Sequence, residues 1–404
     1  MYPTSKKKLT REIYKMKIFY LKKIIRHVLD QRAYHNKNDS IYNILFLFII
    51  TIMILGGCEK KESIKIGFVG DLTGSMSELG INGRNGVLLA VEECNASGGV
   101  NKHLIKLITK NDQHNEEQAL KVDQQLIQEG VVAIIGHMTS TMSVKVLPLI
   151  NKEKMLMISP TTSKLSHLDD YFIRLIPYDQ TSSFLAKYVY QQLGLKSITI
   201  VYDLSNIAFS QMVRDDFTKA FELVGGKIIL SQSFTSGIKI DYINLIRTLI
   251  DSKPEGLLII AGALDTAMIC QHIRMAGSQI PVMHNGWAGT KELVQHGGPA
   301  IEGIIFPIMY NKDSQEKSFI KFKKRYQKRF GHEPDFASVY AYEAALLLIN
   351  ALSESINPVK LKDIILKQAK LDGLQGEITF DKYGDAQRKT SIVKIKNGKV
   401  IVLD

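Results

Sequence analysis

The sequence predicts an α/β protein with two lobes of similar design, each built on a doubly wound parallel sheet. Short apolar runs alternate with amphipathic stretches of about 10–15 residues, which is the pattern of βαβ units. Two neighbouring apolar runs, Val131–Ile135 and Met155–Ile158, are each followed by a cluster of hydroxyl side chains, and the alternation restarts after Pro177. Strands that end in polar clusters indicate a polar ligand site at the carboxyl ends of a parallel sheet.

The positive charge of the chain is concentrated near its start. The 404 residues carry a formal net charge of +12, but residues 1–57 alone contain eleven Lys/Arg and three Asp/Glu, which leaves only +4 for the rest. The high isoelectric point therefore belongs mainly to the leading segment. We expect no nucleic-acid binding.

The leading segment has the features of an export signal. It is basic up to Lys37, and the apolar run Ile44–Leu55 is shorter than the roughly 20 residues that an ordinary spanning helix needs. The run ends in Leu55-Gly56-Gly57-Cys58, which resembles the bacterial lipoprotein box, where the Cys becomes lipidated and is the new N-terminus after cleavage. We expect residues 1–57 to be a signal segment and the exported protein to be lipid-anchored at Cys58, facing the periplasm or the exterior. A membrane anchor that is not cleaved is the alternative.

Apolar periodicity places the remaining elements. For the first lobe we expect strands at residues 64–69, 104–109, 131–135 and 155–158, with helices at 87–94, 116–129 and 142–151. For the second lobe we expect helices at 181–193, 211–224, 242–252 and 266–276, with strands at 197–202, 227–234, 256–260, 281–284 and 303–307. Helices at 314–330, 336–353 and 358–370 follow, and a hairpin at 391–403 turns at Asn397-Gly398.

Several short motifs occur in the order and spacing of one protein family. They are Asp71-Leu72-Thr73-Gly74, Asn95–Val100, Ile158–Ser163, Tyr340–Ala344 and Gly376–Asp381. From Ile64 to Val402 the chain resembles the type I periplasmic substrate-binding proteins of ABC transporters, in particular the branched-chain amino-acid-binding group. The resemblance covers nearly everything after the leading segment.

This resemblance implies a fold and a role. The two lobes would be joined by three crossovers, with residues 58–177 and 309–378 in the first lobe and residues 178–308 and 379–404 in the second. The lobes would close over a small amino-acid-like ligand and deliver it to the permease subunits of an ABC importer. A sensor that uses the same fold to signal to a membrane or regulatory partner is the alternative.

The first-lobe site implied by the resemblance falls on Ser140, Thr161 and Ser163, with Thr139 in the same hydroxyl cluster. In the family, such positions hold the carboxylate and the ammonium of an amino acid. Hydroxyls and free N–H groups at a helix start also favour an anion on physical grounds. The alternative is that these Ser and Thr side chains only cap helices. His137 stays outside the expected site, because a lone His is more often a packed or capping residue.

The second lobe departs from the branched-chain pattern. The aromatic residue expected after the strand that ends at Tyr202 is either Phe209 or a position occupied by Ile207. Where the family often places an acid for the ligand's amine, this chain has a segment ending in Trp287, the single Trp of the sequence. Trp287 could stack on the ligand or pack on the lobe surface. Asp265 could pair with an ammonium or cap a helix, and the same alternatives hold for Asp203.

Nothing in the sequence indicates catalysis. It contains no Gly-x-Ser-x-Gly elbow, no His-Glu-x-x-His, no Walker loop and no paired Cys/His spacing for zinc. Cys94 and Cys270 are the cysteines that follow Cys58, and their separation does not indicate a disulfide. We therefore expect a binding protein that has no enzymatic activity, cofactor or metal.

Overall fold

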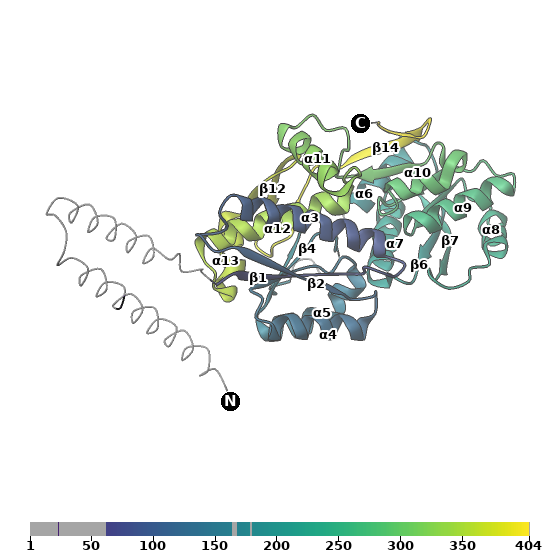
Figure 1. The fold of residues 1–404 in the computed structure, drawn as a ribbon. Helices are drawn as coiled ribbons and strands as arrows, with labels where there is room; N and C mark the ends of the chain where they lie inside the picture. Colours follow the sequence, from purple (N-terminus) through teal and green to yellow (C-terminus); the bar gives the residue numbers. More distant parts are fainter. Residues whose placement is uncertain (1–22, 24–61, 164–167, 178–179, 404) are drawn as a thin grey trace. The chain divides into compact units, whose positions relative to one another are not determined.

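The computed structural model describes residues 23, 62–163, 168–177 and 180–403, and residues 61–404 form one compact unit (Figure 1). Cys58, the expected lipidation site, lies outside the described residues. Within the compact unit, two large sheets each carry helices on both faces. We call the parts built on these two sheets the first and the second lobe.

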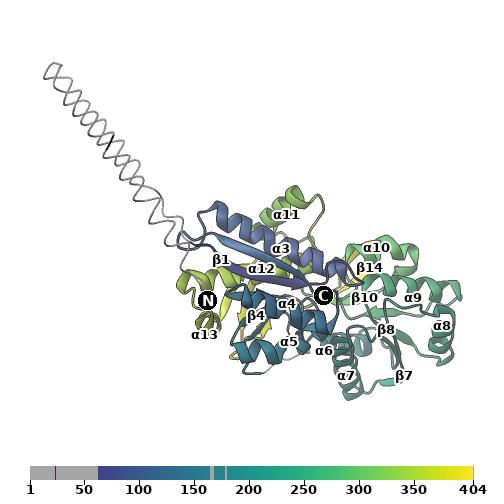
Figure 2. The same cartoon turned by 60° about the horizontal axis from the view of Figure 1, so that its bottom comes forward.

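The sheet of the first lobe has five parallel strands in the order β2-β1-β3-β4-β5. The strands are β1 (Ile64–Gly70), β2 (Ile105–Asn111), β3 (Ala133–Ile135), β4 (Leu156–Ser159) and β5 (Phe172–Arg174). Every residue of β3, β4 and β5 is buried, because helices cover both faces. Helices α4 (Glu116–Gln128) and α5 (Ser140–Glu153) lie on one face, opposite α3 (Ser77–Ala96) and α12 (Phe336–Glu354) (Figures 1 and 2).

Helix α12 forms the centre of the first lobe. It is the one described helix that is long and apolar enough to cross a membrane, but 72% of its apolar window is buried, which is typical of a core helix. It packs against α3 at Gly86, where an added Cβ would lie 2.2 Å from the carbonyl oxygen of Ser338. Asp335 and Ser338 form a capping box at its start. Helices α11 (Lys317–Phe330) and α13 (Pro358–Gln368) complete this face.

The sheet of the second lobe has seven strands in the order β15-β14-β10-β9-β8-β6-β7. They are β6 (Ser197–Asp203), β7 (Lys227–Phe234), β8 (Gly256–Ile260), β9 (Val282–His284), β10 (Ile305–Ile308), β14 (Ser391–Lys396) and β15 (Lys399–Val402). Strands β6 to β10 are parallel, but the hairpin β14–β15 joins β10 antiparallel. The sheet is therefore mixed. The turn at Asn397-Gly398 is confirmed, with positive φ at both residues.

Helices cover the second sheet in two groups. Helices α6 (Gln180–Gln191) and α7 (Ile207–Leu223) lie on one face. Helices α8 (Tyr242–Asp251), α9 (Ala263–Met275) and α10 (Lys291–Gly297), together with a short 3₁₀ turn η2 (Gly298–Ile301), belong to the other.

A small third sheet determines where the chain last crosses between the lobes. Strands β11 (Lys370–Gly373), β12 (Gly376–Phe380) and β13 (Ala386–Gln387) pair antiparallel, and Phe380 and Ala386 belong to the first-lobe core. The buried Arg174 binds this segment through Asp385, at 2.9 Å. The chain therefore makes its last crossing to the second lobe between β13 and β14. This crossing lies later than the boundary at residue 378 that the sequence led us to expect.

Candidate functional site

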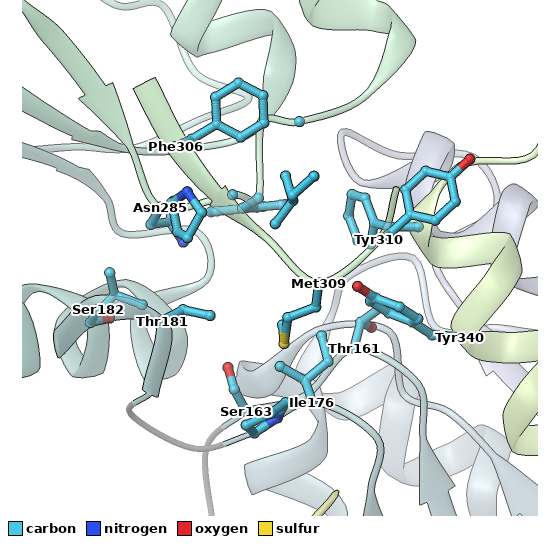
Figure 3. Close-up of a pocket in the computed structure, with 18 of the residues that line it drawn as sticks. Thr161, Ser163, Ile176, Thr181, Ser182, Asn285, Phe306, Met309, Tyr310 and Tyr340 are labelled. Atoms are coloured by element: carbon cyan, nitrogen blue, oxygen red, sulfur yellow. The ribbon is translucent and has the colours of Figure 1, made fainter. Parts of the chain in front are cut away.

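A cavity of about 380 Å³ lies in the cleft between the two lobes. Its walls come from the segments after β3 and β4, the start of α12, the start of α7, the segment after β9, and the crossovers after β5 and β10. Figure 3 shows Thr161, Ser163 and Tyr340 on one side of it and Asn285, Thr181 and Ser182 on the other. The carboxyl ends of the parallel strands of both sheets therefore meet at this cavity, where α/β proteins commonly bind ligands.

Two of the four hydroxyl residues expected in the first lobe line the cavity. Thr161 and Ser163 follow β4 directly. The Thr161 hydroxyl donates to the backbone oxygen of Met138 at 2.7 Å, so its lone pairs are left to accept from a ligand. The Ser163 hydroxyl is buried and has no hydrogen-bond partner among the described residues. Ser163 is therefore the better donor to a bound molecule.

Ser140 and Thr139 lie at the start of α5 and do not line the cavity as it stands. The Ser140 hydroxyl is buried and lacks a partner among the described residues, while the Thr139 hydroxyl lies 3.4 Å from Nδ1 of His114. Thr139 occupies the N-cap position but makes no side-chain capping bond. The helix-capping alternative for Thr139 is therefore wrong.

Aromatic side chains form part of the second-lobe wall. Phe209 and Trp287 both line the cavity, and their rings meet edge to face with centroids 5.5 Å apart. Ile207, the other candidate for the aromatic position, does not line the cavity and is 37% exposed. Of the two candidates, Phe209 is therefore the one that lies at the cavity.

Asp265 does not line the cavity, contrary to its place among the expected ligand contacts. It lies in the first turn of α9, where its carboxylate accepts a hydrogen bond from the Tyr242 hydroxyl at 3.0 Å. Burial raises the pKa of the Asp265 carboxyl. Its position is explained by this contact with α8 rather than by a ligand.

Other polar residues at the cavity were not predicted as ligand contacts from the sequence. Asn285 follows β9, and both its side-chain nitrogen and its side-chain oxygen are buried without a partner among the described residues. Tyr340 comes from the first turns of α12, and the guanidinium of Arg388 lies 4.5 Å from the centre of its ring. The place of Asn285 after a predicted strand was the available signal. Nothing local to Tyr340 indicated that α12 would reach the cleft.

Hydrogen bonds join the lobes beside the cavity. Asn206, just before α7, accepts from the backbone N–H and the hydroxyl of Thr141 at 3.2 and 3.1 Å, and the same hydroxyl accepts from the N–H of Ala208 at 3.2 Å. Nε2 of His114 lies 2.9 Å from the backbone oxygen of Ser205. The lobes are therefore closed against each other at the starts of α5 and α7.

Comparison with known proteins assigns this architecture. A model of the family described as "Periplasmic binding protein" matches residues 63–399. The chain belongs to this family. A Leu/Ile/Val-binding protein homolog of Brucella abortus is 25% identical over 349 residues, covering 83% of this chain and 91% of that protein. The Leu/Ile/Val-binding protein of Escherichia coli K12 is 25% identical over 355 residues, covering 82% of this periplasmic binding protein and 92% of its relative.

Solved structures share the fold. A leucine binding protein from Thermotoga maritima superposes with a TM-score of 0.78 at 24% identity, covering 84% of this chain and 98% of that one. A branched-chain amino acid transporter substrate binding protein from Streptococcus pneumoniae, in complex with isoleucine, superposes with a TM-score of 0.78 at 22% identity. The superposition covers 84% of this chain and 99% of that one. The family description makes this chain a binding protein, and its relatives are named as binding proteins rather than as enzymes.

A buried charged network supports the first-lobe wall of this binding protein. Nδ1 of His137 lies 2.7 Å from Asp112, and Nε2 lies 3.2 Å from Asp123. Burial alone would lower the pKa of His137, but the charges of Asp123 and Asp112 and the hydrogen bonds to them raise it to about 10. The backbone oxygen of His137 accepts from the hydroxyl of Ser159 at 2.7 Å. His137 thus ties the segment after β3 to the end of β4.

Proposed function

We propose that this protein is an extracytoplasmic solute-binding lipoprotein that captures a small polar ligand, an amino acid or a related compound, for an ABC importer. The observation that carries the proposal is the cavity between the lobes, with hydroxyls on the first-lobe wall and an aromatic pair on the second. A cavity of about 380 Å³ suits a molecule of amino-acid size. The names of the relatives support the ligand class, because they are binding proteins for leucine, isoleucine and valine.

Binding should depend on Ser163. The full-length protein in detergent is first screened by thermal shift against amino acids, carboxylates and amides, because a ligand that binds the native state raises the melting temperature. Ser163→Ala should then weaken binding of a confirmed ligand by about tenfold, since a buried polar group that loses its partner costs about 1–3 kcal/mol. Ser353→Ala removes an exposed hydroxyl at the far end of α12 and is the matched control. Equal calorimetric affinities of wild type and Ser163→Ala would refute this placement of the site.

Membrane attachment should depend on Cys58. In the proposal, Cys58 becomes the lipidated N-terminus, which would tether the binding protein at the membrane that carries the permease subunits. We expect Cys58→Ala to move the protein to the soluble fraction or to leave it uncleaved, with a mass change that corresponds to the missing lipid. An unchanged mass together with unchanged membrane attachment would exclude the lipid anchor.

A further inference from the structure

The cavity contains a polar side chain that has no partner within the protein. The buried Nδ2 and Oδ1 of Asn285 both lack a hydrogen bond among the described residues, and Asn285 lines the cavity. Figure 3 shows Asn285 beside the cavity, across from Ser163. Buried amide groups are normally paired, and an unpaired one costs about 1–3 kcal/mol. The missing partner of Asn285 is therefore best supplied by the ligand.

Formal charge is nearly absent from the lining of this cavity. Among the described lining residues, only Lys312 and Asp313 carry formally charged side chains. Both are exposed, and Nζ of Lys312 lies 3.9 Å from Asp313. Among the described residues, the inner wall thus offers hydroxyls, the amides of Asn206 and Asn285, and aromatic or aliphatic surface, but no carboxylate.

The carboxylates at the nearby strand ends bind groups of the protein instead. Asp71 accepts from the backbone N–H groups of Thr73, Gly74 and Met76 at 3.1, 2.7 and 3.0 Å. Asp203 accepts from the N–H groups of Ser205 and Ser236, each at 2.9 Å. None of these acids belongs to the lining, and the same is true of Asp265 with its contact to Tyr242.

The acidic pair at the cleft edge does not supply the missing charge either. Glu78 accepts from the hydroxyl of Thr290 on the second lobe at 3.1 Å. Burial, together with the neighbouring Glu292, raises the pKa of Glu78 to about 8, so its carboxyl is mostly protonated at neutral pH. Its neighbour Leu79, and not Glu78, lines the cavity.

We propose that the ligand carries no ammonium inside this cavity and presents an uncharged carboxamide-type head to Asn285, with an apolar body against Phe209 and Trp287. This inference rests on the proposed function and narrows its ligand class. The N–H and C=O of a carboxamide pair with Oδ1 and Nδ2 of Asn285 at once, which satisfies both atoms. A buried ammonium without a counter-charge would lose its hydration without an equivalent partner, which disfavours a zwitterionic amino acid.

A series of compounds with one carbon skeleton tests the head group. Leucine, 4-methylpentanamide, 4-methylpentanoate and 4-methylpentylamine differ in charge while keeping the same branched six-carbon skeleton. Calorimetry with the full-length protein in detergent should find the amide bound at least about tenfold more tightly than leucine and the amine, because both of these would bury an unpaired ammonium. The inference is overturned if leucine binds as tightly as the amide or more tightly, or if 4-methylpentanoate binds more tightly than the amide.

Asn285→Asp places a carboxylate at the same position with nearly the same shape. The substitution should reverse the preference: the affinity for leucine or for the amine should rise by about tenfold or more relative to the affinity for the amide. Asn350→Asp adds the same charge at an exposed site on α12 and should leave the ranking unchanged. An unchanged ranking in Asn285→Asp overturns the inference. Tight binding of leucine to the wild type would overturn the inference alone, whereas no binding of any compound to either protein would also count against the proposed function.

Discussion

At the residue scale, His137 is a buried charge whose removal should be costly. Both of its ring nitrogens face carboxylates, and its pKa is raised to about 10. We expect His137→Gln to lower the free energy of unfolding by about 3–5 kcal/mol at pH 7, because it leaves Asp112 and Asp123 without their counter-charge. Urea unfolding of both proteins measures this difference.

The pH dependence of that difference identifies the charge as its cause. A raised folded-state pKa gives stability that is fully present below the unfolded value of 6.5 and is lost as the pH rises towards about 10. The difference in the free energy of unfolding between wild type and His137→Gln should therefore decrease between about pH 7 and pH 10. His296→Gln, which changes a half-exposed histidine, should show no such trend. A gap that stays constant with pH would mean that packing, and not charge, explains the loss.

At the element scale, the starts of α5 and α7 hold the lobes together. Asn206 accepts both the N–H and the hydroxyl of Thr141 across the cleft. Asn206→Ala should weaken ligand binding by about fivefold to 150-fold, since two hydrogen bonds of about 0.5–1.5 kcal/mol each are lost only in the closed state. Stopped-flow fluorescence should show the change mainly as faster dissociation. Asn244→Ala, on the outer helix α8, is the control, and equal dissociation rates for Asn206→Ala and wild type would contradict this role.

The elements also show what local sequence patterns could predict. The alternation of apolar runs predicted most strands and helices, because buried parallel strands and amphipathic helices have distinct periods. It placed the start of α3 too late, at residue 87 instead of Ser77. Gly80, Gly83 and Gly86 look like a loop, yet an added Cβ on Gly80 would lie 1.8 Å from the backbone oxygen of Asp71. These glycines allow the helix to pack closely against neighbouring backbone. Local helix propensity does not include such contacts, so it did not predict a helix here. The small sheet of β11, β12 and β13 was missed for a similar reason, since its strands are short and are stabilised by contacts with the first-lobe core.

For the site, the sequence predicted the strand ends better than the direction of each side chain. Thr161, Ser163, Phe209 and Trp287 line the cavity as expected of ligand contacts. Asp265 does not, because Tyr242 from another helix binds its carboxylate. Whether an acid after a strand faces the cleft or the protein depends on such contacts between elements distant in sequence, which a motif does not contain.

At the scale of the whole molecule, closure of the lobes buries acidic groups. Glu78 on α3 meets Thr290 and Glu292 at the start of α10, and Asp335 at the start of α12 adds a further negative charge nearby. Burial is the largest cause of the raised pKa of Glu78, followed by its hydrogen bond and repulsion with Glu292. Opening of the lobes would return Glu78 to water and relieve both effects. Closure therefore favours the protonated carboxyl.

Ligand affinity should accordingly fall as the pH rises. The pKa of Glu78 is about 8 in the closed form against an ordinary value of 4.5. Between these pH values the closed form therefore binds more protons than the open form, and its stability relative to the open form decreases as the pH rises. We expect the wild type to bind a confirmed neutral ligand at least about tenfold more weakly at pH 8.5 than at pH 5.5. Glu78→Gln keeps the shape and a hydrogen-bonding group for Thr290 but cannot ionise, so its affinity should stay nearly constant with pH. Glu316→Gln, which changes an exposed carboxylate outside the cleft, should follow the wild type. If Glu78→Gln and wild type lose affinity in parallel, the pH dependence arises elsewhere, and the contact between Glu78 and the second lobe does not control closure.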